Sequence, residues 1–313
     1  MRIVVCLPEA DASPWLELLA SALPQAVLDR REPESPARAN AGRADYVVMI
    51  HRDREVVAEQ SRPKALFTAS AGVAHVLAMG RLPPEVPVVR VEDAGMAGQM
   101  VRYVLAAVLR ALGHGDAYRR QQREAVWAQR PARDPASFAV GVLGLGVIGT
   151  AIARALALQG FAVRGHARGP QAVEGVACHA GTDGLPAFLA GLDVLVSVLP
   201  HTPATIGLLD RAALARLNDG AHVVNIGRGS SLVEADLLAL LDSGKLAGAT
   251  LDVFPHEPLA PDSPMWAHPK VTVTPHNAGD ILPDILAAQV MRQVAQLERG
   301  EPLQNRVDRG RGY

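Results

Sequence analysis

The sequence has few cysteines and no excess of charge of either sign. Its 313 residues include two cysteines, Cys6 and Cys178, which lie far apart and outside any Cys/His cluster. This spacing argues against a disulfide framework and a structural zinc site, so we expect no metal and a reducing, cytoplasmic setting. The 31 basic and 32 acidic side chains leave a formal net charge of −1. Because the positive and negative charges nearly cancel, there is no electrostatic reason to expect nucleic acid or an anionic membrane as partner.

The sequence also lacks a long apolar segment with the features of a membrane span or a signal peptide. The N-terminal run "MRIVVCLPEA" is short and has no cleavage-site pattern. From Pro135 to Ala153 there is no charged residue, which approaches the length of a transmembrane helix. That run carries four glycines. A buried strand turning into a buried helix therefore fits better, and we expect no membrane partner.

Along the sequence, short apolar runs alternate with helical patterns in two series, which predicts an α/β protein with parallel sheets. Its length suits two domains. The first series has predicted strands at 2–7, 45–50, 64–70 and 86–91 and helices at 14–23 and 95–111. The second has strands at 138–145, 161–167, 192–200, 221–227, 249–254 and 270–275 and helices at 147–160, 231–244 and 283–298. We interpret 130–136, rich in arginine and proline, as a linker, and Ser231 with Glu234 as a helix-capping box.

A glycine-rich loop joins a predicted strand to a predicted helix in the second series. Residues 144–149, "GLGVIG", match the pattern GxGxxG. In such a loop Gly144 permits the tight turn, Gly146 lets the backbone approach a pyrophosphate, and Gly149 allows close helix packing. The N–H groups of Val147 and Ile148 would face the anion at the helix N-terminus. A glycine-rich contact without a ligand is the alternative, but the context favours a dinucleotide site.

The next predicted strand indicates which dinucleotide binds. A carboxylate about 20 residues after the loop would bind the ribose 2′-hydroxyl of NAD, yet no acidic residue lies between Phe161 and Val173. Arg168 is there instead, with His166 nearby, and a guanidinium can bind a 2′-phosphate by two hydrogen bonds. We therefore expect NADPH as cofactor, with weaker use of NADH. The alternative is that Arg168 is a solvated loop residue.

Three chemically active residues follow three later strands. Arg228, Glu257 and His276 each come just after a predicted strand, and polar Asp252 interrupts an apolar run. Since ligands bind beyond the carboxyl ends of parallel strands, these residues should converge. Arg228 could bind the carboxylate of a 2-oxo acid, and His276, oriented by Glu257, could deliver a proton to the ketone oxygen. Each has a plainer alternative: Arg228 could cap a helix or pair with Glu234, and the other two could be turn residues.

The motifs together resemble those of a known family. The stretches "VGVLGLGVIGTAIA", "LPHTPATIGLLD", "VVNIGRGSSLVEADLLALLDSGKLAGATLDVFPHEPL" and "VTVTPHNAG" carry the likeness, and so does the closing "VDRGRGY". The chain resembles the D-isomer-specific 2-hydroxyacid dehydrogenases, nearest to the glyoxylate/hydroxypyruvate reductase A type. The likeness is weak over the first sixty residues.

The resemblance implies a fold and a set of roles. Two Rossmann-like domains are implied, with parallel sheets and a cleft between them: a flavodoxin-like substrate domain from 1–100 plus 283–313, and an NAD(P)-binding domain from 101–282. It implies Arg228 as substrate-binding residue, Glu257 as partner of the histidine and His276 as acid/base and substrate contact. Backbone groups of Ala71, Gly72 and Val73 would bind the substrate carboxylate, and Asp252 the nicotinamide. The implied cofactor-binding set also contains Leu199, Pro200, Thr205, Ile226 and Gly227. A homodimer paired through the cofactor domain and its long helix is implied as well.

The expected activity is NADPH-dependent reduction of small 2-oxo acids, such as glyoxylate or hydroxypyruvate, to D-2-hydroxy acids. Another D-2-hydroxyacid dehydrogenase, for example of the phosphoglycerate type, is one alternative. A non-catalytic nucleotide-sensing protein of the same fold is another, because fold alone does not fix function. The sequence suggests no role for Asp280.

Overall fold

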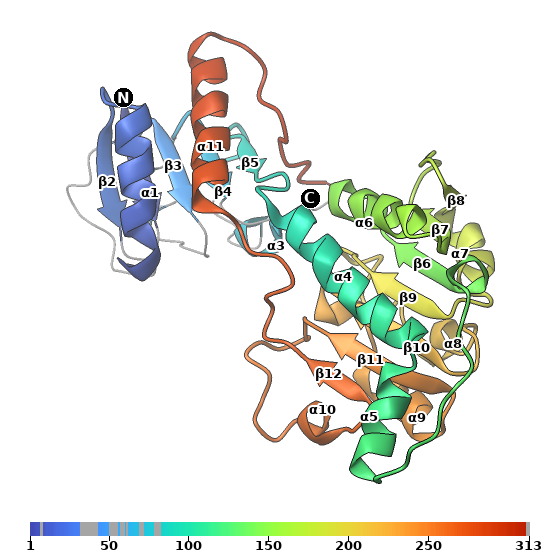
Figure 1. The fold of residues 1–313 in the computed structure, drawn as a ribbon. Coiled ribbons are helices and arrows are strands. Elements are labelled where there is room, and N and C mark those ends of the chain that lie inside the picture. The colour runs from blue at the N-terminus through green and yellow to red at the C-terminus, as the bar shows by residue number, and fades with distance from the viewer. Residues whose placement is uncertain are drawn as a thin grey trace. The chain divides into compact units, whose positions relative to one another are not determined.

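A computed structural model describes residues 1–6, 9–31, 43–49, 56, 60, 62–68, 72–77 and 83–310 (Figure 1). The chain forms two compact units, one built from Met1–Gly95 with Ile281–Tyr313 and the other from Met96–Asp280. The domains expected from the sequence, 1–100 with 283–313 and 101–282, divide the chain at nearby positions. The first unit is thus assembled from both ends of the chain, whereas the second is continuous.

The first unit contains a parallel sheet of five strands in the order β2-β1-β3-β4-β5. This order is that of flavodoxin-like sheets. The strands are β1 (Arg2–Cys6), β2 (Val27–Arg31), β3 (Tyr46–Met49), β4 (Ala65–Thr68) and β5 (Val88–Arg90), and the helices are α1 (Glu9–Ala22), α3 (Ala74–Leu77) and α11 (Pro283–Glu298).

Both faces of this sheet are apolar because successive side chains of a strand point to opposite sides. Ile3 and Val5 join a core cluster that includes residues of α1 and α11. Val4 and Cys6, the alternate positions of β1, join a second cluster that includes Val76 of α3. The C-terminal helix α11 packs beside α1, so it belongs to the first unit although it follows the second in the sequence.

The second unit contains a parallel sheet of seven strands in the order β12-β11-β10-β9-β6-β7-β8. Counted from the first strand of the unit, this is the Rossmann order with one strand added at an edge, and the order reverses between β6 and β9. The strands are β6 (Ala139–Leu143), β7 (Ala162–Ala167), β8 (Val176–Ala180), β9 (Val194–Ser197), β10 (Ala221–Asn225), β11 (Leu246–Leu251) and β12 (Val271–Val273). The α-helices are α4 (Met96–Leu112), α5 (Gly115–Arg123), α6 (Val147–Leu158), α7 (Gly181–Leu189), α8 (Arg211–Leu214), α9 (Glu234–Asp242) and α10 (Pro264–Ala267), with short 3-10 turns η1 (Pro135–Ser137) and η2 (Gly229–Ser231). The two sheets confirm the predicted α/β class.

Helices cover the seven-stranded sheet on both faces. Phe188 of α7, Leu214 of α8 and Leu237 of α9 form one buried cluster with Leu143 and Leu195 of the strands. The helices α4 and α6 pack against each other and contact the sheet, with α4 lying beside β9 and β10. In Figure 1, α4 runs as a long green helix alongside the strands β9 and β10.

Two details predicted from the sequence are wrong. Residues 130–136 do not divide the units: they lie within Met96–Asp280 and join α5 to β6. The chain passes between units at Gly95–Met96 and at Asp280–Ile281 instead. Ser231 does not cap α9, because the N-cap is Val233, which makes no side-chain bond there. The Ser231 hydroxyl donates to the carbonyl oxygen of Arg228 at 2.8 Å.

The strands β2 and β8 were not predicted from the sequence, and both lie at the edge of a sheet. Strand β2 pairs with β1 at one end of the first sheet, and β8 pairs with β7 at one end of the second. Their sequences, "VLDRR" and "VACHA", are partly exposed and lack the continuous apolar run of a strand buried on both faces.

Candidate active site

The glycine loop occupies the point where the strand order of the second sheet reverses, between β6 and α6. Gly144 has φ +104°, a backbone angle that a side chain would strain, and a Cβ on Gly149 would lie 1.8 Å from the carbonyl oxygen of Gly144. A Cβ on Gly146 would meet nothing within 4 Å. The first and third glycines are therefore required by the fold, whereas the second borders open space.

That open space lies at the N-terminus of α6. Gly146 is the N-cap residue and offers no side-chain cap to the first N–H groups of the helix. Val147 is 47% exposed, an unusual position for a large apolar residue at the start of a buried helix. Uncapped N–H groups and the helix dipole favour an anion, and the gap beside Gly146 suits the close approach of a pyrophosphate. These residues fit a dinucleotide.

Two side chains follow the glycine loop at the end of β7. His166 places Nε2 2.9 Å from the carbonyl oxygen of Gly181, to which Nε2 must donate, and its ring lies 5.4 Å from that of Phe188. This imidazole therefore joins β7 to the start of α7. Arg168 is exposed just beyond the strand. Contact of either residue with a cofactor stays a prediction.

The loop after β9 is closed by its own hydrogen bonds. The Thr205 hydroxyl donates to the carbonyl oxygen of Pro200 at 2.6 Å and accepts from the Thr202 N–H at 2.9 Å. A Cβ on Gly227 would lie 2.5 Å from the Leu199 nitrogen, so this glycine is needed where the ends of β9 and β10 approach each other. The Ile226 N–H donates to Ser197 at 3.1 Å across the same pair of strands.

Asp252 organises the turn that carries His276. This side chain is 1% exposed and follows β11 directly. Its Oδ1 accepts from the Thr274 hydroxyl at 2.6 Å and the Asn277 N–H at 2.9 Å, and its Oδ2 accepts from the Ala278 N–H at 3.0 Å. A contact with nicotinamide, which the resemblance implies, could use only the acceptor position left on Oδ2.

His276 and Glu257 are brought together although they follow different strands. His276 has φ +54°, uncommon for a residue with a side chain, and its N–H donates to the Asp252 carbonyl oxygen at 2.9 Å. Its Nδ1 lies 2.7 Å from Glu257 Oε2, and the other oxygen of Glu257 accepts from the Phe254 N–H at 2.8 Å. Because Nδ1 is bound to the carboxylate, Nε2 is the nitrogen left for another molecule.

Arg228 is a mostly buried cation without a close carboxylate. Its Nη1 donates to the carbonyl oxygen of Gly227 at 2.7 Å. It makes no side-chain cap, and none of the ion pairs among the described residues includes it, so the plainer pairing with Glu234 is not found. Burial lowers the pKa of the Arg228 guanidinium, and the charge of Glu257 partly offsets this. The remaining N–H donors can serve an anion such as a carboxylate.

Sequence reasoning missed the residue that fixes the backbone at Arg228. Asn225 is fully buried at the end of β10, where its Nδ2 donates to the Arg228 carbonyl oxygen at 3.2 Å and its Oδ1 accepts from the Gly227 N–H at 3.3 Å. A polar residue in the apolar run "AHVVNIG" was the available signal, of the same kind that drew attention to Asp252.

The predicted substrate-carboxylate loop belongs to the first unit. Ala71 lies outside the described residues. Gly72 and Val73 follow β4 and precede α3, and the Val73 side chain is 2% exposed. A buried valine side chain leaves the backbone as the polar part of this position, and its binding role stays a prediction.

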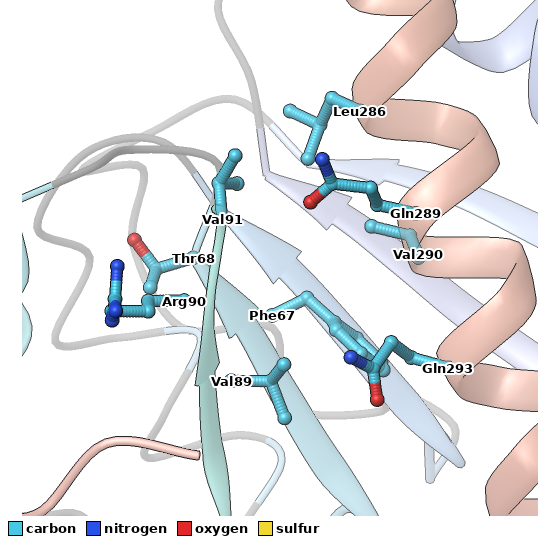
Figure 2. A pocket seen from close by; sticks show the side chains of 9 residues that line it. All are labelled: Phe67, Thr68, Val89, Arg90, Val91, Leu286, Gln289, Val290 and Gln293. Atoms are coloured by element: carbon cyan, nitrogen blue, oxygen red, sulfur yellow. The ribbon is translucent and has the colours of Figure 1, made fainter. Parts of the chain in front are cut away.

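Figure 2 shows a pocket in the first unit, where side chains of α11 face β4 and β5. Its amide groups already have partners. Gln289 Nε2 donates to the Glu92 carbonyl oxygen at 2.7 Å, and Gln293 Nε2 donates to that of Gln304 at 3.1 Å. The pocket is therefore a gap between the sheet and α11, a helix that hydrogen bonds hold in place. Within the described ranges, no group of three or more His, Cys, Asp or Glu side chains is placed to hold a metal ion, and no helix is long and apolar enough to cross a membrane.

The chain is similar to known proteins over its whole length. The model of the D-isomer specific 2-hydroxyacid dehydrogenase NAD binding domain matches residues 105–278. A Yersinia enterocolitica glyoxylate/hydroxypyruvate reductase A is 40% identical, over 100% of both chains. A D-isomer specific 2-hydroxyacid dehydrogenase of Xanthobacter autotrophicus, crystallised with NADPH, is 39% identical with TM-score 0.91, over 100% of this chain and 99% of that one. An NADPH-dependent glyoxylate/hydroxypyruvate reductase of Sinorhizobium meliloti, crystallised with NADP and sulfate, is 36% identical with the same TM-score and coverage.

Proposed function

Since this chain belongs to the D-isomer specific 2-hydroxyacid dehydrogenase family, we propose that it reduces small 2-oxo acids to D-2-hydroxy acids with NADPH. Glyoxylate and hydroxypyruvate are the substrates named for two similar proteins. The observation that carries the proposal is a His276–Glu257 pair in a turn held by buried Asp252: Nδ1 lies 2.7 Å from Glu257 Oε2, and the charge of the same carboxylate acts on Arg228. A histidine held in this way is suited to proton transfer.

Each residue then has a role set by its geometry. NADPH, when bound, supplies a hydride to the carbonyl carbon of the 2-oxo acid. Arg228 binds the substrate carboxylate through its unused N–H donors and stabilises the charge that builds on the ketone oxygen. His276 delivers a proton from Nε2 to that oxygen, so the products are the 2-hydroxy acid and NADP⁺. Glu257 holds Nδ1 and stabilises the imidazolium.

An assay of several 2-oxo acids with NADPH tests the proposed reaction. We expect loss of the absorbance of NADPH with glyoxylate and hydroxypyruvate. Faster turnover of larger 2-oxo acids would redirect the proposal to another D-2-hydroxyacid dehydrogenase activity. If the protein binds NADPH but oxidises it with none of the acids, a nucleotide-sensing role replaces the enzymatic one.

We infer a preference for NADPH over NADH from the end of β7. No acidic side chain lies between Phe161 and Val173 to bind a ribose 2′-hydroxyl, and Arg168 is exposed there. We expect Arg168→Asp to lower kcat/KM for NADPH at least tenfold, because a carboxylate repels the 2′-phosphate, while NADH is affected little. Arg164→Asp is the matched control, since Arg164 Nη1 is bound to the Ala190 carbonyl oxygen at 2.5 Å. Unchanged discrimination in Arg168→Asp would contradict the inference.

We also propose that the protein forms a homodimer through the second unit. Leu109 on α4 is 48% exposed, and beyond α5 Val126 is 48% and Trp127 fully exposed. Large apolar side chains exposed to solvent, as on α4 and the segment after α5, support an interface there. The mass of the protein in solution tests this proposal.

A further inference from the structure

The strands β11 and β12 carry a row of polar residues on the side that faces α4. A parallel sheet covered on both faces normally has apolar side chains on both. Thr250 lies in β11, and Asp252 comes directly after that strand. At the alternate positions of the neighbouring strand, Thr272 lies in β12 and Thr274 comes directly after it. Such a row needs hydrogen-bonding partners from the helix that covers it.

The helix α4 supplies those partners from two residues seven positions apart, which lie on the same face of a helix. Arg110 donates to the hydroxyls of Thr250 and Thr272, both at 3.0 Å. Tyr103 places its hydroxyl 2.6 Å from Thr274 Oγ1. Arg110 binds the two threonines within the strands, whereas Tyr103 binds Thr274 at the carboxyl end of β12.

The direction of the Tyr103 link follows from the chemistry of its neighbours. Thr274 has one hydroxyl hydrogen, which it donates to the Asp252 carboxylate at 2.6 Å. Tyr103 must therefore donate to Thr274. Burial raises the pKa of the Tyr103 phenol, the charge of Asp252 adds to this, and the charge of Arg110 opposes it. The net increase keeps the phenol a donor at neutral pH.

The chain of bonds ends at the turn that carries His276. Asp252 holds the N–H groups of Asn277 and Ala278, and its own carbonyl oxygen holds the His276 N–H. The positive φ of His276 needs such support, because a residue with a side chain rarely adopts it. The imidazole is 46% exposed, so packing alone does not fix its direction.

The same helix also holds the far end of this turn. Gln99, one turn before Tyr103 on α4, donates to the Asp280 carbonyl oxygen at 2.7 Å and accepts from the Asp280 N–H at 3.2 Å. A Cβ on Gly279 would lie 2.6 Å from Met100 Cγ, so the backbone passes close to the helix. The backbone of Asp280, a residue without a predicted role, is thus one of two attachments of the turn to α4.

We propose that Tyr103 is a positioning residue for His276, acting through Thr274 and Asp252. This inference rests on the proposed function, because it assigns His276 the proton transfer that Tyr103 supports. Tyr103 itself contacts neither substrate nor cofactor in this scheme. Its hydroxyl donates a hydrogen bond to Thr274, which in turn donates to the Asp252 carboxylate. That carboxylate holds the turn that carries His276, and so it helps to place the imidazole against Glu257.

Kinetics of substituted enzymes test the hydrogen bonds of Tyr103 and Thr274 one at a time. Thr274→Val keeps the shape of the side chain and removes its hydroxyl. We expect it to lower kcat on the order of 10- to 100-fold, because a slightly misplaced His276 transfers its proton more slowly. The KM for NADPH should stay nearly unchanged. Thr274→Ser should restore kcat to within about threefold of the original enzyme. Tyr103→Phe should lower kcat roughly 3- to 10-fold, and the double substitution Tyr103→Phe with Thr274→Val should equal Thr274→Val alone.

Thr272→Val is the matched control. It removes the same hydroxyl from the same face of the same strand, but Thr272 is bound to Arg110 rather than to Asp252. We expect kcat to stay within about twofold of the original enzyme while the Tm falls about as much as in Thr274→Val. Equal losses of kcat in Thr272→Val and Thr274→Val, or multiplicative losses in the double substitution, would overturn the proposal.

A second measurement does not depend on turnover. Hydrogen–deuterium exchange of a peptide spanning 274–280 should quicken in Thr274→Val and Tyr103→Phe, because Asp252 then holds the Asn277 and Ala278 amides less firmly. In Thr272→Val it should not change. If the protein reduces no 2-oxo acid, this exchange still decides whether Tyr103 holds the turn. If exchange and kcat are both unaffected in an active enzyme, only the positioning role fails.

Discussion

At the scale of single residues, the side chain with the most specific setting is His276. Ten histidines are present in the chain, and several contact a carboxylate. His268 Nε2 lies 3.2 Å from Asp242 Oδ1, just as His276 Nδ1 lies 2.7 Å from Glu257 Oε2. A contact with a carboxylate is therefore insufficient as evidence. The difference is that His276 follows a strand at the carboxyl edge, in a turn held by a buried aspartate.

The two histidine–carboxylate pairs provide a controlled test of the proton donor. We expect His276→Ala to lower kcat by roughly 10²- to 10⁴-fold, the contribution of a positioned general acid, with NADPH affinity retained. His268→Ala should leave kcat within about twofold of the original enzyme. Rates measured with saturating NADPH and fluorescence titration of the cofactor separate the two effects. Near-normal turnover of His276→Ala would exclude the assigned role.

At the scale of elements, the glycine loop before α6 separates the demands of folding from those of binding. A Cβ on Gly149 would lie 1.8 Å from a carbonyl oxygen, whereas one on Gly146 would meet nothing within 4 Å. We expect Gly149→Ala to lower the Tm strongly or prevent folding. Gly146→Ala should keep the Tm and weaken NADPH binding at least tenfold, because its methyl group enters the space of the pyrophosphate. Thermal unfolding and cofactor titration measure the two. Unchanged affinity in Gly146→Ala would argue against a dinucleotide at this loop.

The attachment of α5 to the sheet offers a prediction about pH. Asp116 lies 3.3 Å from His222 Nδ1 and 3.5 Å from Arg110 Nε, and Gly248 leaves room for this cluster. Burial alone would raise the pKa of the Asp116 carboxyl, but His222, Arg110 and Arg119 together lower it. The pKa of Asp116 is therefore lower in the folded state than in the unfolded state, where it is about 3.9. Ionised Asp116 stabilises the fold at pH values above the unfolded-state pKa. This stabilisation is lost as the pH falls through the folded-state pKa.

Asp116→Asn should therefore be less stable than the original protein at neutral pH, and the difference should shrink below about pH 4. Urea unfolding over a pH series measures it. Asp219→Asn is the control, since Asp219 is 91% exposed and pairs with Lys245 at the surface, where ion pairs contribute little. A stability difference that stays constant down to acid pH would show that Asp116 acts by shape rather than by charge.

Elements with strong periodic patterns could be predicted from the sequence, and contacts between distant segments could not. The apolar run at Val194–Ser197 and the glycine loop predicted the second sheet and the edge at which a ligand is expected, because burial on both faces dictates the residue types. The placement of His276 beside Glu257 followed from their positions after neighbouring strands. The bond from Tyr103 to Thr274 joins residues 171 positions apart, and a helical tyrosine carries no local signal of such a partner.

At the scale of the whole molecule, the two units differ in how the chain builds them. The second is one continuous segment, Met96–Asp280, whereas the first needs both chain ends. A large buried cluster of the second unit, which includes Leu143, Phe188 and Leu237, is formed by residues of that segment. The glycine loop and the His276 turn lie within it too. Continuity and a core of its own are the requirements for independent folding.

We therefore expect a fragment of residues 96–280 to fold cooperatively and to bind NADPH within about tenfold of the affinity of the full chain. It should not reduce 2-oxo acids at a normal rate, because it lacks Gly72 and Val73, which are predicted to bind the substrate carboxylate. Thermal unfolding, cofactor titration and the reductase assay test these three expectations. A folded fragment with full activity would show that the first unit contributes nothing to the substrate site, and the assignment of Gly72 and Val73 would fail while that of His276 would stand.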